Sequence, residues 1–182
     1  MRPTLTAPPG PADHYLGPAD APVVLVEYGD YQCPHCGRAH AVLQQVLAEL
    51  GDAVRFIFRN FPLSESHPDA DAAAEAAESV AAHGGNAAFW DMHDILYENQ
   101  DALSVDDLLG YAAAAGVDAG AVADDLSSGA QRWRVRDDVR SGERSGVTGT
   151  PTFFVNGIRF EGDWSNPRAF AAALQDAAAA RQ

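Results

Sequence analysis

Apolar and polar positions near the start of the chain follow a strand, helix and strand pattern. Residues 23–28 form a short, β-branched and nearly continuous apolar run, which is typical of a strand covered on both faces. Apolar residues then recur at helical spacing over residues 39–50, and Gly51 is a natural stop. Residues 54–59 form a second strand-like run. The pattern predicts a β-α-β unit whose first strand is central and parallel to the second.

The long segment that follows shows helical periodicity. Over residues 63–145 we find no convincing strand pattern, and the two glycines at 84–85 should end an Ala-rich helix. Asn86 can cap the next helix, and Ser104 followed by Asp107 has the form of a capping box at the start of another. The segment is therefore predicted to be an all-helical insertion.

Strand signals return in the last part of the chain. Residues 152–155 and 158–160 are apolar runs joined by Asn156-Gly157, the strongest short-range signal for a hairpin. Asn166-Pro167 can start a final helix. The predicted fold class is α/β, with β-α-β, a helical insertion and then β-β-α. We expect three parts, namely a flexible lead-in (1–15), an α/β domain in two pieces (16–62 and 146–182) and the insertion (63–145).

Composition and charge exclude several classes of function. With 47% hydrophobic and 21% charged residues, the 182-residue chain resembles an ordinary globular protein, and we expect a monomer. Its net charge of −14 disfavours binding to nucleic acid or to an anionic membrane surface. No apolar run approaches the roughly 20 residues of a membrane helix, so no membrane insertion is expected. Without a recognisable export signal the expected location is cytoplasmic, or periplasmic or extracytoplasmic if such a signal has been removed.

The two cysteines of the chain, Cys33 and Cys36, are separated by only two residues. A disulfide between them would close too small a ring to stabilise the fold by restricting the unfolded chain. The pair is therefore expected to be redox-active or metal-binding. Pro34 is suited to the first turn of a helix, which places Cys33 at the positive end of the helix dipole.

The position of Cys33 predicts that the two thiols have different roles. Unpaired backbone N–H groups and the helix dipole stabilise a thiolate at a helix start, so Cys33 is the expected nucleophile and the more exposed sulfur. Cys36, one turn further on, is the expected resolving thiol. A partly positive His35 imidazole would stabilise the thiolate further and make the disulfide more oxidising. Such chemistry needs no organic or metal cofactor, because the sulfurs carry the electrons.

Glu27 is an anomaly, because it interrupts an otherwise apolar strand that leads to the cysteines. If it is buried, its pKa could be raised, and its carboxyl group could exchange protons with the resolving thiol. Alternatively, it could be an edge-facing carboxylate paired with Arg55 or Arg59. The sequence leaves both interpretations open.

Two motifs together resemble the thioredoxin-fold disulfide oxidoreductases, specifically their bacterial DsbA-like branch. These are the Cys-Pro-His-Cys sequence at 33–36, after a strand and at a helix start, and the segment 146–157, which contains Thr150-Pro151 before the hairpin. The resemblance implies that Pro151 is the family's cis-proline, packed against the cysteines, and that Thr150 presents its backbone to an extended substrate segment. It also implies that Glu27 matches a buried acidic residue of the family.

These observations predict a thiol–disulfide oxidoreductase that acts on protein or small-molecule disulfides. A mixed disulfide would form at Cys33 and be resolved by Cys36, an unidentified partner would recycle the pair, and the direction of electron flow stays open. The alternatives are a non-catalytic binding or chaperone module, or a metal-holding protein with His40 as a third ligand. No second Cys or His pair has zinc-ligand spacing, however. His93 is expected to be a satisfied core histidine.

Overall fold

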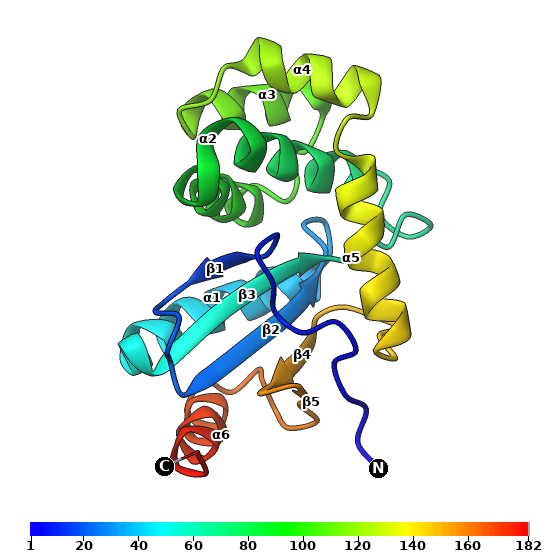
Figure 1. The fold of residues 1–182 in the computed structure, drawn as a ribbon. Coiled ribbons are helices and arrows are strands. Elements are labelled where there is room, and N and C mark those ends of the chain that lie inside the picture. Colours follow the sequence, from blue (N-terminus) through cyan, green and yellow to red (C-terminus); the bar gives the residue numbers. More distant parts are fainter. Residues whose placement is uncertain (182) are drawn as a thin grey trace.

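The computed structural model describes residues 1–181, and within them the strands form one five-stranded sheet in the order β1-β3-β2-β4-β5 (Figure 1). β2 and β3 are parallel, whereas the other neighbouring strands are antiparallel. The predicted central strand is therefore confirmed. The strands are β1 (His14–Leu16), β2 (Val23–Gly29), β3 (Val54–Asn60), β4 (Thr152–Val155) and β5 (Ile158–Arg159).

The helices follow the predicted order, with one between β2 and β3, four in the insertion and one at the end. In Figure 1, α2, α3 and α4 of the insertion lie above the sheet, α5 runs down beside it, and the last helix lies below it. The predicted fold class is thus confirmed. The helices are α1 (Pro34–Leu50), α2 (Ala70–Glu98), α3 (Val105–Ala114), α4 (Ala119–Ser128), α5 (Arg132–Arg144) and α6 (Pro167–Ala179), with a short 3₁₀ turn, η1 (Gly51–Ala53).

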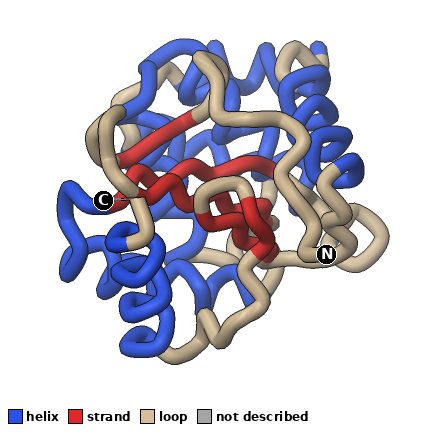
Figure 2. Tube along the Cα trace, turned by 60° about the horizontal axis from the view of Figure 1, so that its bottom comes forward, coloured by secondary structure: helices blue, strands red, loops and turns tan. Residues whose placement is uncertain are grey.

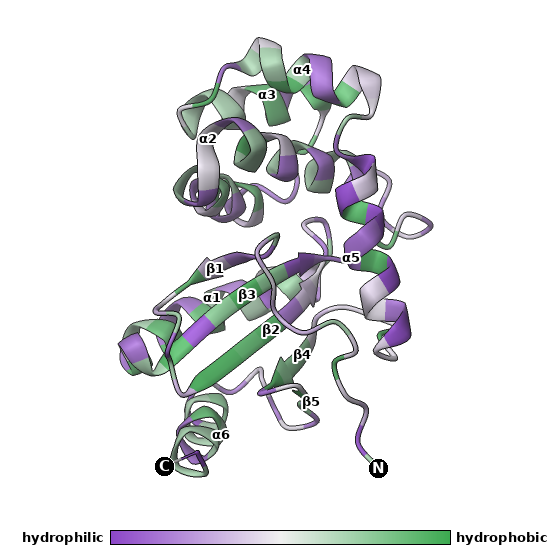
Figure 3. Cartoon of the chain, in the orientation of Figure 1, coloured by the Kyte–Doolittle hydropathy of each residue, from purple (hydrophilic) through white to green (hydrophobic). Residues whose placement is uncertain are grey.

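Both faces of the sheet are covered, as the continuous apolar character of β2 predicts. Leu25 of β2 belongs to the larger hydrophobic core, together with Leu43 of α1 and Phe170 of α6. Val26, which points to the opposite face, packs in a second cluster with Val139 of α5. Figure 2 shows the strands at the centre of the molecule with helices around them, and Figure 3 shows hydrophobic residues along β2. Glu27 shares the Leu25 face, the side on which α1 carries the cysteines.

The turn and capping signals in the sequence correspond to observed local structure. Asn156 and Gly157 have φ values of 49° and 82°, as a tight hairpin turn requires. Ser104 and Asp107 form the reciprocal capping box at α3. The Asn166 side chain accepts hydrogen bonds from the first backbone N–H groups of α6. These three predictions are confirmed.

The predicted Gly-Gly break occurs as a kink that divides α2 into two helical segments. Gly85, with φ 82° and ψ −171°, is the residue with non-helical geometry inside α2. Asn86 does not act as the expected cap, since its side chain accepts from the Tyr15 backbone N–H and donates to the Tyr15 carbonyl oxygen. The Asn86 side-chain amide therefore links β1 to the insertion through two hydrogen bonds.

The N-terminal segment, predicted to be a flexible lead-in (residues 1–15), makes defined contacts with the sheet. Thr4 forms an isolated β-bridge with Ile158, and His14 begins β1. Asp13 forms an ion pair with the buried Arg59, with an oxygen–nitrogen distance of 2.8 Å. Four prolines within residues 3–11 disfavour a helix and are compatible with this extended course across the sheet.

Within residues 1–181, no helix is both long and apolar enough to cross a membrane.

Candidate active site

The cysteine pair lies where the chain turns from β2 into α1. Cys33 is the N-cap of α1, with extended backbone geometry, and Pro34 follows in the first turn as predicted. Both cysteines are free thiols. Cys36 is fully buried, and Cys33 is only 3% exposed. Cys33 is thus the more exposed of the two, as expected, but only slightly, because the loop containing Thr150 approaches its sulfur.

The surroundings of the two thiols shift their pKa values in opposite directions. A hydrogen bond with the Cys36 side chain, and further ones with Thr150 and the backbone N–H groups of Cys36 and His35, outweigh burial and lower the pKa of Cys33 to about 5. Burial, followed by the hydrogen bond with Cys33, raises the pKa of Cys36. At neutral pH the site therefore holds a thiolate at Cys33 and a protonated thiol at Cys36.

His35 contributes to the site through its backbone rather than through a buried ring. Its side chain is exposed, and its Nδ1 faces the guanidinium group of Arg38. Its backbone N–H is among the groups that lower the pKa of Cys33. The helix start thus supplies the stabilisation that the sequence suggested, while the effect of the imidazole stays a prediction.

Glu27 is buried, which decides between the two interpretations of this residue. It is 1% exposed, its Oε1 has no hydrogen-bond partner, and burial followed by the charge of Cys33 raises its pKa to about 8. Arg59 pairs with Asp13 instead, and the Arg55 guanidinium lies 4.1 Å from the centre of the Tyr15 ring. The alternative of an edge carboxylate paired with an arginine is therefore wrong.

The segment before β4 brings the second motif to the cysteines. The Cys33 Sγ lies 3.7 Å from the Thr150 carbonyl oxygen, and the Thr150–Pro151 peptide bond is cis. The Thr150 hydroxyl is buried and has no hydrogen-bond partner by distance and angle. It is, however, among the groups that stabilise the Cys33 thiolate. Thr150 therefore offers a carbonyl acceptor to the thiol and a hydroxyl donor to the thiolate.

Gln100 in the insertion holds the active-site loop, a role that sequence analysis missed. Its Nε2 donates to the carbonyl oxygens of Tyr31 and Cys33, both at 2.9 Å. A Cβ at Gly37 would come within 2.2 Å of the Gln100 Oε1, so the glycine leaves room for this contact. The small residue directly after the Cys-Pro-His-Cys motif was the available signal, but it did not identify the partner.

The Asp30 carboxylate holds the same loop through several hydrogen bonds. One carboxylate oxygen accepts from the Gln32 backbone N–H at 2.7 Å, and the other contacts the His67 Nδ1 at 2.7 Å and accepts from the Leu63 backbone N–H. Gln32 and Asp69 in turn exchange two hydrogen bonds. The loop before α1 is therefore held by residues 63–69, which connect β3 to α2.

The third-ligand role considered for His40 is not supported by its position. Among residues 1–181, the one group of three potential metal ligands within 4.8 Å of one another is His40, His93 and Asp94, which includes neither cysteine. His93 is 2% exposed, and its Nδ1 lies 2.9 Å from the Tyr31 hydroxyl. The interpretation of His93 as a hydrogen-bonded core histidine is confirmed.

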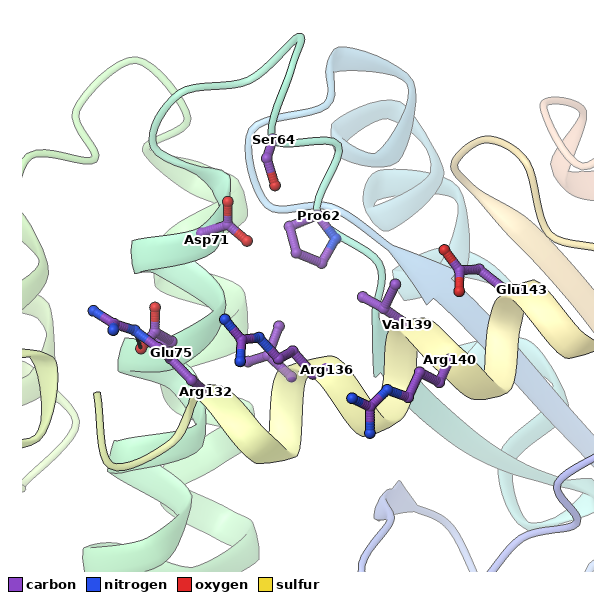
Figure 4. Close-up of a pocket in the computed structure, with 10 residues that line it drawn as sticks. Pro62, Ser64, Asp71, Glu75, Arg132, Arg136, Val139, Arg140 and Glu143 are labelled. Carbon is purple, nitrogen blue, oxygen red and sulfur yellow. Dashed lines mark ion pairs between the residues drawn. The ribbon is translucent and has the colours of Figure 1, made fainter. Parts of the chain in front are cut away.

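A cavity of about 630 Å³ lies between α2 and α5, and neither cysteine lines it (Figure 4). The side chains of Arg132, Arg136 and Arg140 follow one another along α5 beside it. Arg132 forms an ion pair with Glu75, with a nitrogen–oxygen distance of 3.4 Å. The cavity therefore lies outside the thiol chemistry described above.

The sheet, the helical insertion and the paired thiols at the start of α1 together define a DsbA-like thioredoxin fold. A family model described as Thioredoxin matches residues 10–176. The chain therefore belongs to this thioredoxin family.

Solved structures support the same fold. BdbD from Bacillus subtilis matches with a TM-score of 0.84 and 22% identity, over 98% of this chain and 96% of that one. The α-DsbA1 protein of Wolbachia pipientis matches with a TM-score of 0.82 and 18% identity, over 95% and 94% of the two chains. MdbA from Corynebacterium diphtheriae, a thiol-disulfide oxidoreductase, matches with a TM-score of 0.71 and 16% identity, over 97% and 92%.

The curated relatives with higher sequence identity are named as Na⁺/H⁺ antiporters. The chain is 43% identical over 165 residues to the Na⁺/H⁺ antiporter NhaA 1 of Salinispora arenicola, covering 91% of this chain and 24% of that protein. It is 42% identical over 169 residues to NhaA 3 of Salinispora tropica, covering 93% and 25%. The chain thus spans about a quarter of the length of these relatives, and the named antiport describes those whole proteins.

Proposed function

We propose that this chain is a thiol–disulfide oxidoreductase that exchanges disulfides with protein or small-molecule substrates. The observation that carries the proposal is the asymmetry of the pair, in which the pKa of Cys33 is lowered to about 5 while that of Cys36 is raised. An attacking thiol must be a thiolate, and a good leaving thiol has a low pKa. Cys33 meets both conditions at neutral pH.

The exchange can be written with balanced electrons for the oxidising direction. A substrate thiolate attacks the Cys33 sulfur of the Cys33–Cys36 disulfide, forming a mixed disulfide and releasing the Cys36 sulfur. A second substrate thiolate attacks the substrate sulfur of the mixed disulfide, which releases an oxidised substrate and the Cys33 thiolate. Two electrons pass from the substrate thiols to the cysteine pair. Reduction of a substrate follows the same steps in reverse.

Glu27 is proposed to move the proton that accompanies the Cys36 step. The released Cys36 sulfur has a strong affinity for a proton, because burial raises its pKa. Glu27 is buried on the same side of the sheet, and its pKa of about 8 allows it to gain or lose a proton near neutral pH. No partner holds its Oε1 in place, which leaves that oxygen available for transfer.

We propose that the couple is oxidising and that the Thr150-Pro151 segment positions the substrate. A stabilised Cys33 thiolate favours the reduced form of the protein, so the disulfide form tends to accept electrons. The Thr150 carbonyl oxygen already faces the Cys33 sulfur at 3.7 Å, where the backbone of an extended substrate segment would arrive. Such a couple suits an oxidising compartment, which favours the extracytoplasmic over the cytoplasmic placement, with a separate partner that re-oxidises the pair.

The test is to trap the mixed disulfide. Cys36→Ala removes the resolving sulfur, so incubation of the variant with a disulfide-containing peptide should leave that peptide bound through Cys33, detectable by mass and released by dithiothreitol. The Cys33→Ser/Cys36→Ala variant is the matched control and should trap nothing. Absence of any adduct in a folded Cys36→Ala protein would overturn the proposal. Full function after Cys33→Ser would instead identify a binding or chaperone module.

A further inference from the structure

Two histidines and an aspartate meet where the helix that carries the cysteines packs against the insertion. His40 lies on α1, whereas His93 and Asp94 are neighbours on α2. Each offers one ligating atom, and the three atoms all lie within 4.8 Å of one another. The three residues line a cavity of about 240 Å³, together with Trp90 and apolar residues such as Leu43. The oxidoreductase mechanism above uses none of the three.

His40 supplies the first indication of a ligand. The residue is 9% exposed, and its buried Nε2 has no hydrogen-bond partner. The nearest charged group is Asp94, whose Oδ1 lies 3.7 Å from that nitrogen. This distance is too long for a hydrogen bond, which brings such atoms to about 2.7 to 3.2 Å. An unpaired buried nitrogen costs stability unless something else contacts it.

The same distance suits two atoms that bind one metal ion. Ligands about 2.0 to 2.1 Å from a tetrahedral ion lie about 3.3 Å apart, so His40 and Asp94 need to approach only slightly. The Asp94 side chain is about half exposed, which gives it freedom to move and gives an ion access from solvent. The His40–Asp94 distance is therefore close to that between two ligands of one ion.

His93 is held in an orientation suited to ligation. Its Nδ1 is hydrogen-bonded to the Tyr31 hydroxyl at 2.9 Å, so the Nε2 is the nitrogen left for an ion. A hydrogen bond on the far ring nitrogen is how proteins commonly fix the ring of a metal-binding histidine. Burial lowers the pKa of both His40 and His93, which keeps the imidazoles neutral as ligation requires.

We infer that His40, His93 and Asp94 form a binding site for one divalent first-row transition metal ion, with zinc as the best match. Two imidazole nitrogens and one carboxylate are typical ligands for zinc, cobalt or nickel, and water would complete the coordination. Calcium and magnesium instead prefer oxygen ligands throughout. Because the ligands come from α1 and α2, the ion would tie the insertion to the helix that carries the cysteines.

A packing role is the competing explanation for the two histidines. The His40 ring stacks on Tyr97, with centroids 5.0 Å apart and an interplanar angle of 25°. Such contacts account for the position of the rings, but not for the unpartnered Nε2 or for the nearby carboxylate. The two explanations differ in what they expect of Asp94.

The test measures metal binding to the 182-residue chain without a histidine tag. Cys33→Ser/Cys36→Ser serves as the background, so that thiolates cannot bind the ion. Titration with Co²⁺, followed by calorimetry and visible absorption, should show one ion per chain, displaced by Zn²⁺ but not by excess Mg²⁺. Zn²⁺ should also raise the thermal unfolding temperature, because it binds the folded state.

Matched variants separate ligation from general attraction. Asp94→Asn should weaken Co²⁺ binding by about tenfold or more and abolish the rise in unfolding temperature with Zn²⁺. Asp91→Asn removes the same charge from α2 outside the three-ligand group and should leave both measurements nearly unchanged. Absence of Co²⁺ and Zn²⁺ binding to the background protein would overturn the inference. Equal weakening by Asp91→Asn and Asp94→Asn would also overturn it.

Discussion

The sulfur of Cys33 lies 3.7 Å from the carbonyl oxygen of Thr150, although 117 positions separate the two residues in the sequence. The approach joins the start of α1 to the segment before β4. The Thr150 hydroxyl is buried without a hydrogen-bond partner, and it contributes to lowering the pKa of Cys33. Thr150 therefore helps to determine how acidic Cys33 is.

Thr150→Val should raise the pKa of Cys33 from about 5. The substitution keeps the β-branched shape but removes the hydroxyl donor, and loss of one hydrogen bond to a thiolate is expected to raise the pKa by about one unit. The pH dependence of Cys33 alkylation in the reduced protein measures the change. Thr148→Val, at an exposed position of the same loop, is the control and should leave the pKa unaltered. An unchanged pKa in Thr150→Val would show that the hydroxyl plays no part.

Gln100→Ala should destabilise the protein by about 1 to 3 kcal/mol, because the carbonyl oxygens of Tyr31 and Cys33 lose the amide that they share. It should also shift the equilibrium of the cysteine pair with glutathione, since the Cys33 carbonyl lies at the reacting position. Urea unfolding and a redox titration measure the two effects. Asn99→Ala is the control, because its exposed side chain bonds only to Ile95 of its own helix. A stability loss without a change in the redox equilibrium would reduce Gln100 to a structural role.

The fold could be predicted because its signals are local. The apolar run in β2, the Asn156-Gly157 turn and the capping residues of α3 and α6 each act within a few residues, and each occurs as expected. The contacts of the N-terminal segment were not predicted, because they depend on distant partners. Asp13 pairs with Arg59, which lies 46 positions away in the sequence, and no local sequence pattern predicts such an ion pair.

The candidate site also has some features that local sequence predicts and others that depend on tertiary packing. The Cys33-Pro34 start of α1 is a local feature, and its position at the helix terminus follows from proline chemistry. The burial of Cys33 and the contact from Gln100 depend on how the insertion and the loop before β4 pack. Glu27 was recognisable as an anomaly, but only the structure shows that both nearby arginines have other partners.

Asp13→Ala should destabilise the protein by about 3 to 5 kcal/mol, because Arg59 would be left as a buried charge without its carboxylate. The Arg59 guanidinium also donates to the Ala7 carbonyl oxygen, so the same change should loosen the N-terminal segment. Denaturant unfolding measures the stability, and hydrogen exchange measures the segment. Asp20→Ala, at an exposed position, should change neither. Equal stability of the two variants would mean that the ion pair contributes little.

Glu27→Gln should make the protein more stable at alkaline pH while leaving stability near pH 4 little changed. The folded-state pKa of Glu27 is about 8, above its ordinary value of 4.5, because burial disfavours the charged form. Below pH 4.5 the group is protonated whether the chain is folded or unfolded. Between pH 4.5 and 8 the unfolded chain loses this proton more readily than the folded protein, so stability declines as pH rises.

The whole decline is on the order of 5 kcal/mol, and it should be absent from the glutamine variant, which cannot ionise. Urea unfolding of the reduced protein from pH 4 to pH 9 measures the difference between wild type and Glu27→Gln. Glu49→Gln, at an exposed position of α1, is the control and should follow the wild type. The variant should also slow resolution of the mixed disulfide by Cys36, because the proposed proton carrier is missing. Parallel pH profiles for wild type and Glu27→Gln would contradict the raised pKa, whereas an altered profile with unchanged resolution would remove Glu27 from the mechanism alone.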